Sequence, residues 1–456
     1  MAGVLLAWLL PVTVGMGVLI CGIIVVISVT YWLSKNPFIC LVVLFIAVDI
    51  PRISFKLFGL RAEPEHIASG LLLLAAIWML RRQETLNFRW IFPDALLLGL
   101  IVMDYFSSIV MSVQPSQTLK WSTQQTLSIL PYFFIRILIS DAEKLRRAVR
   151  IMIGIAAAAA TYAVFCYASH ILLGTTLGVS LELYEGIPAL HGTQYEPNLL
   201  GSFCGASFIL SFIVYLKERN KKMLFCAVIT ATAMALSMSR AALLATFVVA
   251  GIALVVSRRT GLLDRRASRK MAAAVLGLTL TLGVVVVPSY IERFSSVDLS
   301  DVASDPDTQV RLLTWAAALD GIARHPILGN GVGSIQLFFS YEEFGYEGLE
   351  IGVWIGNTEM RALHDTGLVG LLILLYFFLV LARRSIRFLR GTLNAELLGL
   401  LLSGVVYFIA FQATDGSLLS FFWVHLGLLA TALSLNGSRS LTNAPSLPPD
   451  VSNTQV

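Results

Sequence analysis

Two arginines of this chain stand where a guanidinium group needs an anionic partner. Arg240 follows Ser237-Met238-Ser239 between two short apolar runs, and Arg311 follows the segment Asp305-Pro306-Asp307-Thr308. Because a guanidinium binds anionic oxygens through paired N–H donors, both arginines are candidate anion-binding residues. A structural alternative stays open for each. Arg240 is then the tip of a helical hairpin that reaches the membrane surface, and Arg311 pairs with Asp305 or Asp307 at the start of its helix.

Three side chains have the chemistry of a general base, namely His364, Glu359 and Glu196. A histidine has a neutral form at physiological pH that accepts a proton without a large pKa shift. Carboxylates also serve as general bases. For His364 the alternative is a structural hydrogen bond beside Asp365 at the start of a helix. Asn198 is a candidate ligand contact, with helix capping as the alternative.

A glycine-rich turn runs from His325 to Gly333. Closely spaced glycines allow tight turns and bring backbone N–H groups towards an anion. A purely structural turn is the alternative, and no preceding strand supports a dinucleotide-binding fingerprint. The chain also lacks a Cys/His spacing that suits zinc, so we expect no metal at the site.

The elements that position these residues are membrane helices. Hydrophobic residues make up 57% of the chain and charged residues 13%, which excludes a water-soluble globule. The apolar runs are long enough to cross the hydrocarbon layer as helices, and they lack the alternation of a membrane β-barrel. We therefore predict an all-α, polytopic integral membrane protein with about 12–14 transmembrane helices and one large, partly helical external loop. The predicted spans are 5–31, 37–50, 65–81, 93–113, 119–140, 147–172, 197–216, 223–239, 241–257, 271–288, 365–382, 395–412 and 418–434.

The distribution of lysine and arginine predicts the orientation of these spans. Basic clusters follow or precede spans at 144–150, 217–222, 258–270 and 383–390, and these connections should face the cytoplasm. The connection 288–364, here called the outer loop, carries eleven acidic residues and four arginines and should face outward. The cations lie at membrane edges, so we expect membrane lipids and no nucleic acid among the partners.

We divide the chain into a polytopic membrane domain, 1–435, and a disordered cytoplasmic tail, 436–456, that is rich in Ser, Pro and Asn. Within the outer loop, the helix start at Asp305-Pro306-Asp307-Thr308 predicts a helix over Gln309 to Ala323. We expect Arg311, Trp315 and Leu319 to share the face of this helix that points inward at the membrane surface.

Several segments, taken in order, resemble the O-antigen ligase and polymerase family of bacterial envelope proteins. The resemblance is carried by motifs within about 190–380: Tyr195-Glu196-Pro197-Asn198-Leu199-Leu200-Gly201, Ser237-Met238-Ser239-Arg240, Arg311-Leu312-Leu313-Thr314-Trp315, His325-Pro326-Ile327-Leu328-Gly329-Asn330-Gly331-Val332-Gly333 and Asn357-Thr358-Glu359-Met360-Arg361-Ala362-Leu363-His364-Asp365-Thr366-Gly367-Leu368-Val369-Gly370. Each motif is short, and the match depends on their order and spacing.

The resemblance implies a glycosyltransferase of the bacterial inner (cytoplasmic) membrane that needs neither metal nor cofactor. Such a protein takes a glycan from an undecaprenyl-pyrophosphate carrier on the periplasmic face and passes it to another glycan or to lipid A–core. The products are O-antigen, exopolysaccharide or capsule. By this resemblance Arg240 and Arg311 hold the pyrophosphate, and Asn357, Asn198 and Trp315 contact the substrate.

One departure from the family pattern bears on the reaction. Ligases of this family carry a histidine immediately before the asparagine of the last motif, and this chain has Gly356 before Asn357. The departure favours a polymerase or a divergent relative over a lipid A–core ligase. The alternatives are a polysaccharide transporter or flippase, which would show paired halves with interrupted helices, and a non-catalytic scaffold of the same family.

The predicted orientation is tested with single cysteines in a chain whose native cysteines have been removed. A cysteine at Ser340, in the outer loop, should react with an impermeant thiol reagent in intact spheroplasts. A cysteine at Ser268, in a basic connection, should react only after the membrane is opened. The reverse labelling pattern would invert the topology.

Overall fold

The computed structural model describes residues 28–32, 35–51, 55–57, 60–81, 88–181, 188–262, 306–338 and 354–442. This part of the chain is almost entirely helical, which confirms the predicted all-α membrane fold. The elements are α2 (Pro37–Val48), β1 (Phe55–Leu57), β2 (Leu60–Ala62), α3 (Pro64–Arg81), α4 (Phe92–Val110), α5 (Pro115–Leu138), α6 (Ala142–Leu173), β3 (Val179–Ser180), β4 (Ala189–Leu190), α7 (Pro197–Glu218), α8 (Lys221–Leu236), α9 (Arg240–Arg259), α11 (Pro306–Arg324), α12 (Ile335–Phe338), α13 (Thr358–Gly391), α14 (Ala395–Ala410) and α15 (Ser420–Thr442).

Most predicted spans have a helical counterpart, apart from 5–31 and 271–288, which lie mostly or wholly outside the described residues. Helices α4, α6, α7, α9 and α13 are long and apolar enough to cross a membrane. The short strands pair only as two antiparallel hairpins, β1 with β2 and β3 with β4. Helix α15 continues to Thr442 and so passes the predicted domain boundary at 435. The rest of the predicted tail lies outside the described residues.

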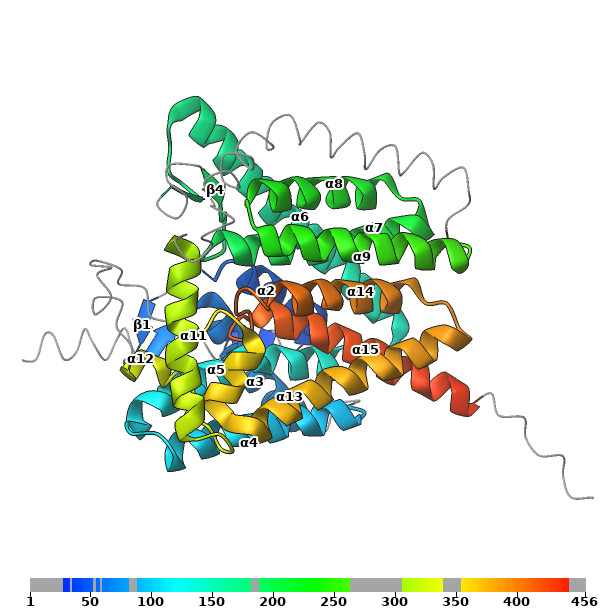
Figure 1. The fold of residues 1–456 in the computed structure, drawn as a ribbon. Coiled ribbons are helices and arrows are strands. Elements are labelled where there is room, and N and C mark those ends of the chain that lie inside the picture. The colour runs from blue at the N-terminus through cyan, green and yellow to red at the C-terminus, as the bar shows by residue number, and fades with distance from the viewer. Residues whose placement is uncertain are drawn as a thin grey trace, which may run out of the picture.

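The long helices form a layered bundle with α7 at its centre. Helix α7 is the most deeply buried of the candidate spans and packs against α8, α9 and α14, while α15 packs against α5 and α13 against α4. Figure 1 shows α11 lying across one end of this bundle, beside the start of α13. Segments that are far apart in the sequence therefore meet at that end.

The basic clusters gather at the other end of the bundle. Arg150 at the start of α6 binds Glu218 at the end of α7, with an Nη2–Oε1 distance of 2.6 Å. Glu396 at the start of α14 lies 3.2 Å from Lys217 Nζ and 3.3 Å from Arg146 Nε. Three predicted cytoplasmic connections thus lie together, as the charge pattern requires.

A buried ion pair joins three helices inside the bundle. Arg136 of α5 and Asp94 of α4 are almost completely buried, and Arg136 Nη2 lies 2.9 Å from Asp94 Oδ2. Tyr132 donates to the same carboxylate at 2.7 Å, and Arg136 also donates to Ser434 of α15 at 2.7 Å. Because both charges are fully hydrogen-bonded, the pair holds α4, α5 and α15 in register without an uncompensated charge in the membrane.

Helix α13 is interrupted near its start by Gly367, whose φ of 68° and ψ of −169° are non-helical. The glycine-rich turn fits into this interruption: Leu368 N–H donates to Pro326 O at 2.9 Å, and Val369 N–H donates to Ile327 O at 3.3 Å. A Cβ atom at Gly367 would lie 2.2 Å from Ile327 O, so no other residue fits. The first two turns of α13 therefore form a short helical segment, separated from the rest of α13 by the kink at Gly367.

We expect Gly367→Ala to lower the stability of the purified protein by about 3 kcal/mol or more, because it adds a backbone clash to a glycine-only conformation. Thermal unfolding in detergent measures this effect. Gly251→Ala is the matched control, since Gly251 lies within α9 and has open space around its Cβ position. The control should unfold at or slightly above the wild-type temperature. Equal stability of the two variants would contradict the proposed fit.

Candidate functional site

The backbone N–H groups of Gly331, Val332 and Gly333 in the glycine-rich turn all donate hydrogen bonds within the protein. Gly331 N–H donates to Asp365 O at 3.0 Å and to Ser107 Oγ at 3.0 Å, and Val332 N–H donates to Ser108 Oγ at 3.0 Å. Gly333 N–H donates to Asp365 Oδ2 at 3.1 Å. The hypothesis of an anion-binding turn is therefore wrong and the structural alternative is confirmed. The glycines allow close backbone approach, as at Gly329, where a Cβ would lie 2.4 Å from Asp365 O.

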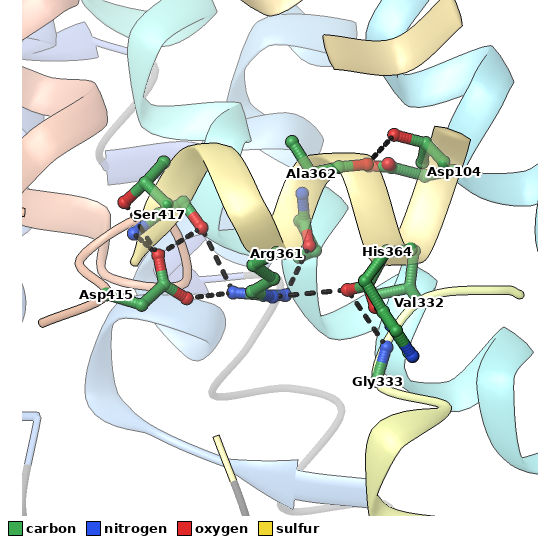
Figure 2. Close-up of polar contacts among 12 residues, drawn as sticks. Asp104, Val332, Gly333, Arg361, Ala362, His364, Asp415 and Ser417 are labelled. Carbon is green, nitrogen blue, oxygen red and sulfur yellow. Dashed lines mark hydrogen bonds and ion pairs between the residues drawn. The ribbon is translucent and has the colours of Figure 1, made fainter. Parts of the chain in front are cut away.

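Arg361 of α13 is the most heavily bonded charged residue at this end of the bundle. Its side chain is 4% exposed, and it forms ion pairs with Asp415 and, at 3.2 Å, with Asp365. Figure 2 shows the guanidinium between Asp415 and Ser417 on one side and the segment of His364 on the other. Its Nη2 donates to Gln125 Oε1 at 2.8 Å. Sequence reasoning placed Arg361 in a family motif but gave it no role, although an arginine and an aspartate four residues apart signal a pair.

Beside Arg361 lies a small cavity with a buried acidic residue. Asp104 of α4 is 1% exposed, and its Oδ2 has no hydrogen-bond partner. The cavity has a volume of about 20 Å³ and is lined by Asp104, Gln125, Arg361 and Asp365, among others. That space holds one water molecule, which would complete the hydrogen bonding of Asp104.

His364 belongs to the same network and faces away from solvent. It is 1% exposed, and its Nδ1 lies 2.9 Å from Asp365 Oδ1. Its imidazole packs against Gly321 of α11, where an added Cβ would lie 2.6 Å from Nε2. The structural alternative for His364, a hydrogen bond beside Asp365, is confirmed. A side chain buried between two helices is poorly placed to meet an acceptor hydroxyl.

Arg311 reaches from α11 to the connection between α14 and α15, here called the α14–α15 loop (411–419). The half-buried Arg311 donates from Nη1 to Ala413 O. A Cβ at Gly356 would lie 3.9 Å from Arg311 Nη1 and 3.8 Å from Ala413 O. The Gly356 position therefore faces the Arg311 guanidinium at van der Waals distance.

Asn357 and Glu359 brace the same loop. Asn357 caps α13, since its Oδ1 accepts from Met360 N–H at 2.8 Å, and its Nδ2 lies 3.1 Å from Gln412 O. Glu359 Oε2 accepts from Gln412 Nε2 at 2.9 Å. Asn357 thus has a local structural function at the edge of the site.

Glu196 reaches the α14–α15 loop from the start of α7. Its Oε1 accepts from Thr414 Oγ1 at 2.7 Å, and the Thr414 Cα lies 4.0 Å from the Cβ position of Gly356. Glu196 is half-buried. Of the three candidate bases, it is the one hydrogen-bonded to a residue that lines the Gly356 position. The half-buried Asn198 lies in the first turn of α7, and its carbonyl accepts from Ser202 Oγ at 2.6 Å.

Arg240 stands at the same end as Glu196. It begins α9 directly after Ser239, whose hydroxyl accepts from Ala242 N–H and caps the helix. Ser239 packs against Gly201 of α7, where an added Cβ would lie 2.8 Å from Ser239 Cβ. The start of α9 thus lies about one turn along α7 from Glu196 and Asn198. Helices α8 and α9 meet at Ser237–Ser239, and this hairpin places Arg240 near the start of α7.

Trp315 and Leu319 of α11 lie in different surroundings. The half-buried Trp315 packs in an apolar cluster with Ala318, Ile335 and Ile355, and its Nε1 is buried without a hydrogen-bond partner. Leu319 is 55% exposed on the protein surface, so its position against the membrane stays a prediction. Thr314 and Ala318 are the buried residues of α11, and Gly321 allows the close approach of α11 to His364.

The structure therefore brings together Arg311, Gly356, Ala413, Thr414 and Glu196, here called the arginine site, with Arg240 and Asn198 at the adjoining helix starts. His364 lies outside the arginine site, in the network of Arg361. The elements that build it are the starts of α7, α9 and α13, helix α11 and the α14–α15 loop.

We expect His364→Ala to reduce protein abundance and thermal stability, since it leaves a cavity against α11 and a buried Asp365 with one partner fewer. His364→Gln, which keeps volume and hydrogen-bonding capacity, should regain most of the stability and with it the activity. Immunoblotting of membranes and unfolding in detergent measure both variants. A fully stable His364→Ala protein without activity would restore the role of His364 as a base.

Residues 225–375 match the protein-family model described as O-antigen ligase. No curated protein matches the chain. The matched region runs from α8 into α13 and contains Arg240, Arg311, Asn357 and His364. This similarity supports a role in polysaccharide assembly. The chain is thus an all-helical, multi-pass membrane protein whose residues 225–375 are similar to the O-antigen ligase family.

Proposed function

We propose that this protein transfers a glycan from an undecaprenyl-pyrophosphate carrier to the hydroxyl group of an acceptor glycan at the periplasmic face of the inner membrane. The observation that carries the proposal is the convergence of Arg311 and Glu196 on the α14–α15 loop beside Gly356. A cation and a carboxylate held by the adjacent residues Ala413 and Thr414 provide an anion-binding group and a proton acceptor. Glycosyl transfer from a pyrophosphate requires both.

Arg311 and Arg240 bind the pyrophosphate in this proposal. As the glycosidic bond to the pyrophosphate breaks, negative charge develops on the leaving oxygen, and guanidinium donors stabilise it. The Arg311 bond to Ala413 O uses one Nη1 hydrogen and leaves other N–H donors of its fork for phosphate oxygens. Asn198 lies one turn from the start of α9 and adds a polar group at the same end.

Glu196 acts as the general base in place of the missing histidine. The acceptor hydroxyl attacks the anomeric carbon, its proton passes to the Glu196 carboxylate, and the carrier pyrophosphate leaves with the electron pair of the broken bond. Thr414 holds Glu196 towards Gly356 through its hydroxyl. The absence of a side chain at Gly356 leaves room for the acceptor where a histidine would stand.

The polymerase reaction is the version that we favour, because Gly356 replaces the histidine that the ligases of this family carry. The acceptor is then a second carrier-linked glycan. The test separates carrier-linked and core-linked products by length in a strain that lacks this gene and carries it on a plasmid. Long chains on the carrier support polymerase activity, and glycan on lipid A–core supports ligase activity. If neither product forms, the proposed transfer is contradicted.

Arg311→Ala and Arg240→Ala should each abolish transfer at normal membrane abundance, and lysine should rescue poorly because it loses the paired donors. A loss of about 3 kcal/mol in transition-state binding lowers the rate about a hundredfold. The matched control is Arg324→Ala, at the exposed end of α11, where Arg324 pairs only with the exposed Asp320 among the described residues. Wild-type transfer by Arg311→Ala would reduce Arg311 to a brace for the α14–α15 loop.

Glu196→Gln should lower the transfer rate by about 10²–10⁴-fold, since the amide keeps the hydrogen bond to Thr414 but cannot take the proton. Glu359→Gln is the comparison, because that carboxylate contacts Gln412 at the edge of the site. Single-turnover transfer by purified protein measures both rates. If Glu359→Gln loses transfer while Glu196→Gln retains it, the two roles are exchanged.

A further inference from the structure

The end of α13 carries arginines whose charge is not offset by any acidic residue of the same helix segment. They are Arg383, Arg384, Arg387 and Arg390. All of these side chains are exposed, and none has an ion-pair partner in the described part of the chain. No acidic residue lies between Asp365 and Glu396 in the sequence. The end of α13 therefore presents a surplus of positive charge to its surroundings.

Several basic residues on neighbouring helices of the same end are neutralised instead. Arg147 of α6 pairs with Glu143 at 3.0 Å. Lys217 of α7 pairs with Glu396 of α14 at 3.2 Å. An ion pair on the protein uses the charge locally, whereas the guanidinium groups at the end of α13 remain available to an anion from outside.

Three of these arginines continue an exposed apolar stripe of α13. Tyr376 and Leu379 are each 47% exposed, and Arg383, Arg387 and Arg390 follow at the same spacing of three or four residues. Residues at this spacing share one face of a helix. This face thus changes from apolar to cationic after Leu379. A lipid leaflet has the same order, with acyl chains first and headgroups next.

Exposed aromatic side chains beside the stripe mark the membrane interface. Phe92 at the start of α4 contacts Tyr376 edge to face, with ring centroids 5.7 Å apart. Phe92 is 46% exposed, and Trp90, just before α4, is 62% exposed. Tryptophan and tyrosine gather at the interfaces between membrane and water. Arg383 lies about 10 Å beyond Tyr376 along the helix axis, so it stands on the water side of these rings, at the level of the headgroups.

We propose that Arg383, Arg387 and Arg390, here called the basic face of α13, bind the phosphate group of an anionic phospholipid whose acyl chains lie along Leu379 and Tyr376. Guanidinium groups bind phosphate oxygens through paired donors, and cations next to a membrane span attract anionic lipids. The end of α13 lies at the opposite end of the bundle from α11 (Figure 1). Lipid binding there does not depend on the proposed transfer reaction.

The experiment uses the full-length protein, purified in detergent and freed of bound lipid. Its thermal unfolding is followed during titration with phosphatidylglycerol, and with phosphatidylcholine and inorganic phosphate as comparisons. We expect a saturable rise of the unfolding temperature with phosphatidylglycerol and none with the other two, because only phosphatidylglycerol joins a net negative charge to acyl chains. The combined variant Arg383→Gln, Arg387→Gln and Arg390→Gln should lose affinity about a hundredfold. If this variant does not fold, Arg387→Gln alone should still lose affinity severalfold.

The matched control removes the same amount of charge elsewhere on the protein surface. Lys221, Lys222 and Arg258 are exposed residues at the start of α8 and near the end of α9. Their joint replacement by glutamine should leave the affinity for phosphatidylglycerol nearly unchanged. An equal loss in this control would overturn the proposal, since it would reduce the effect to general surface charge. Equal stabilisation by phosphatidylcholine or inorganic phosphate would also overturn it. Stabilisation by polyglutamate with none by phosphatidylglycerol would assign the basic face of α13 to an acidic protein segment.

Discussion

The arrangement of the functional end of this protein depends on the buried charge of Arg361. Its guanidinium is held by Asp365, one turn further along α13, by Asp415 and Ser417 of the α14–α15 loop, and by Gln125 of α5. A buried charge that loses one partner costs about 3–5 kcal/mol. Arg361 therefore ties three elements together: the start of α13, the α14–α15 loop and α5. If one of them moved away, a buried charge would lose its partner.

The second acid of this network, Asp365, extends the constraint to the glycine-rich turn. Its Oδ2 accepts from both Arg361 and Gly333, its Oδ1 from His364, and its carbonyl oxygen from Gly331 and Ser107. Nearly every acceptor of Asp365 is thus in use. The sequence of the glycine-rich turn suggests an anion-binding loop. In the structure this turn instead packs at the interruption of α13 and hydrogen-bonds the backbone there at Leu368 and Val369. Anion binding at this end is therefore proposed for Arg311 and Arg240 and not for the turn.

The sequence predicted the helices well and the polar network poorly, for a physical reason. Apolar runs such as 197–216 and 395–412 carry their own signal, since a span must be long and apolar wherever its neighbours lie. The partners of Arg361 are 54 and 236 residues away in the chain, at Asp415 and Gln125. Nothing local specifies such contacts. For the same reason His364 looked like a base in sequence, whereas its burial against Gly321 depends on where α11 crosses α13.

The neighbours of Gly356 decide which carboxylate the proposed reaction can use. Ala413, Arg311 and Thr414 lie nearest to this position, and Thr414 is bonded to Glu196, the residue before the first turn of α7. In the proposed reaction the base therefore comes from α7 and not from α13. Ser239, which precedes Arg240, packs on Gly201 of the same helix α7. Helix α7 thus supports both the proposed base and the start of α9, and under the proposal the space beside Gly356 is left for the acceptor.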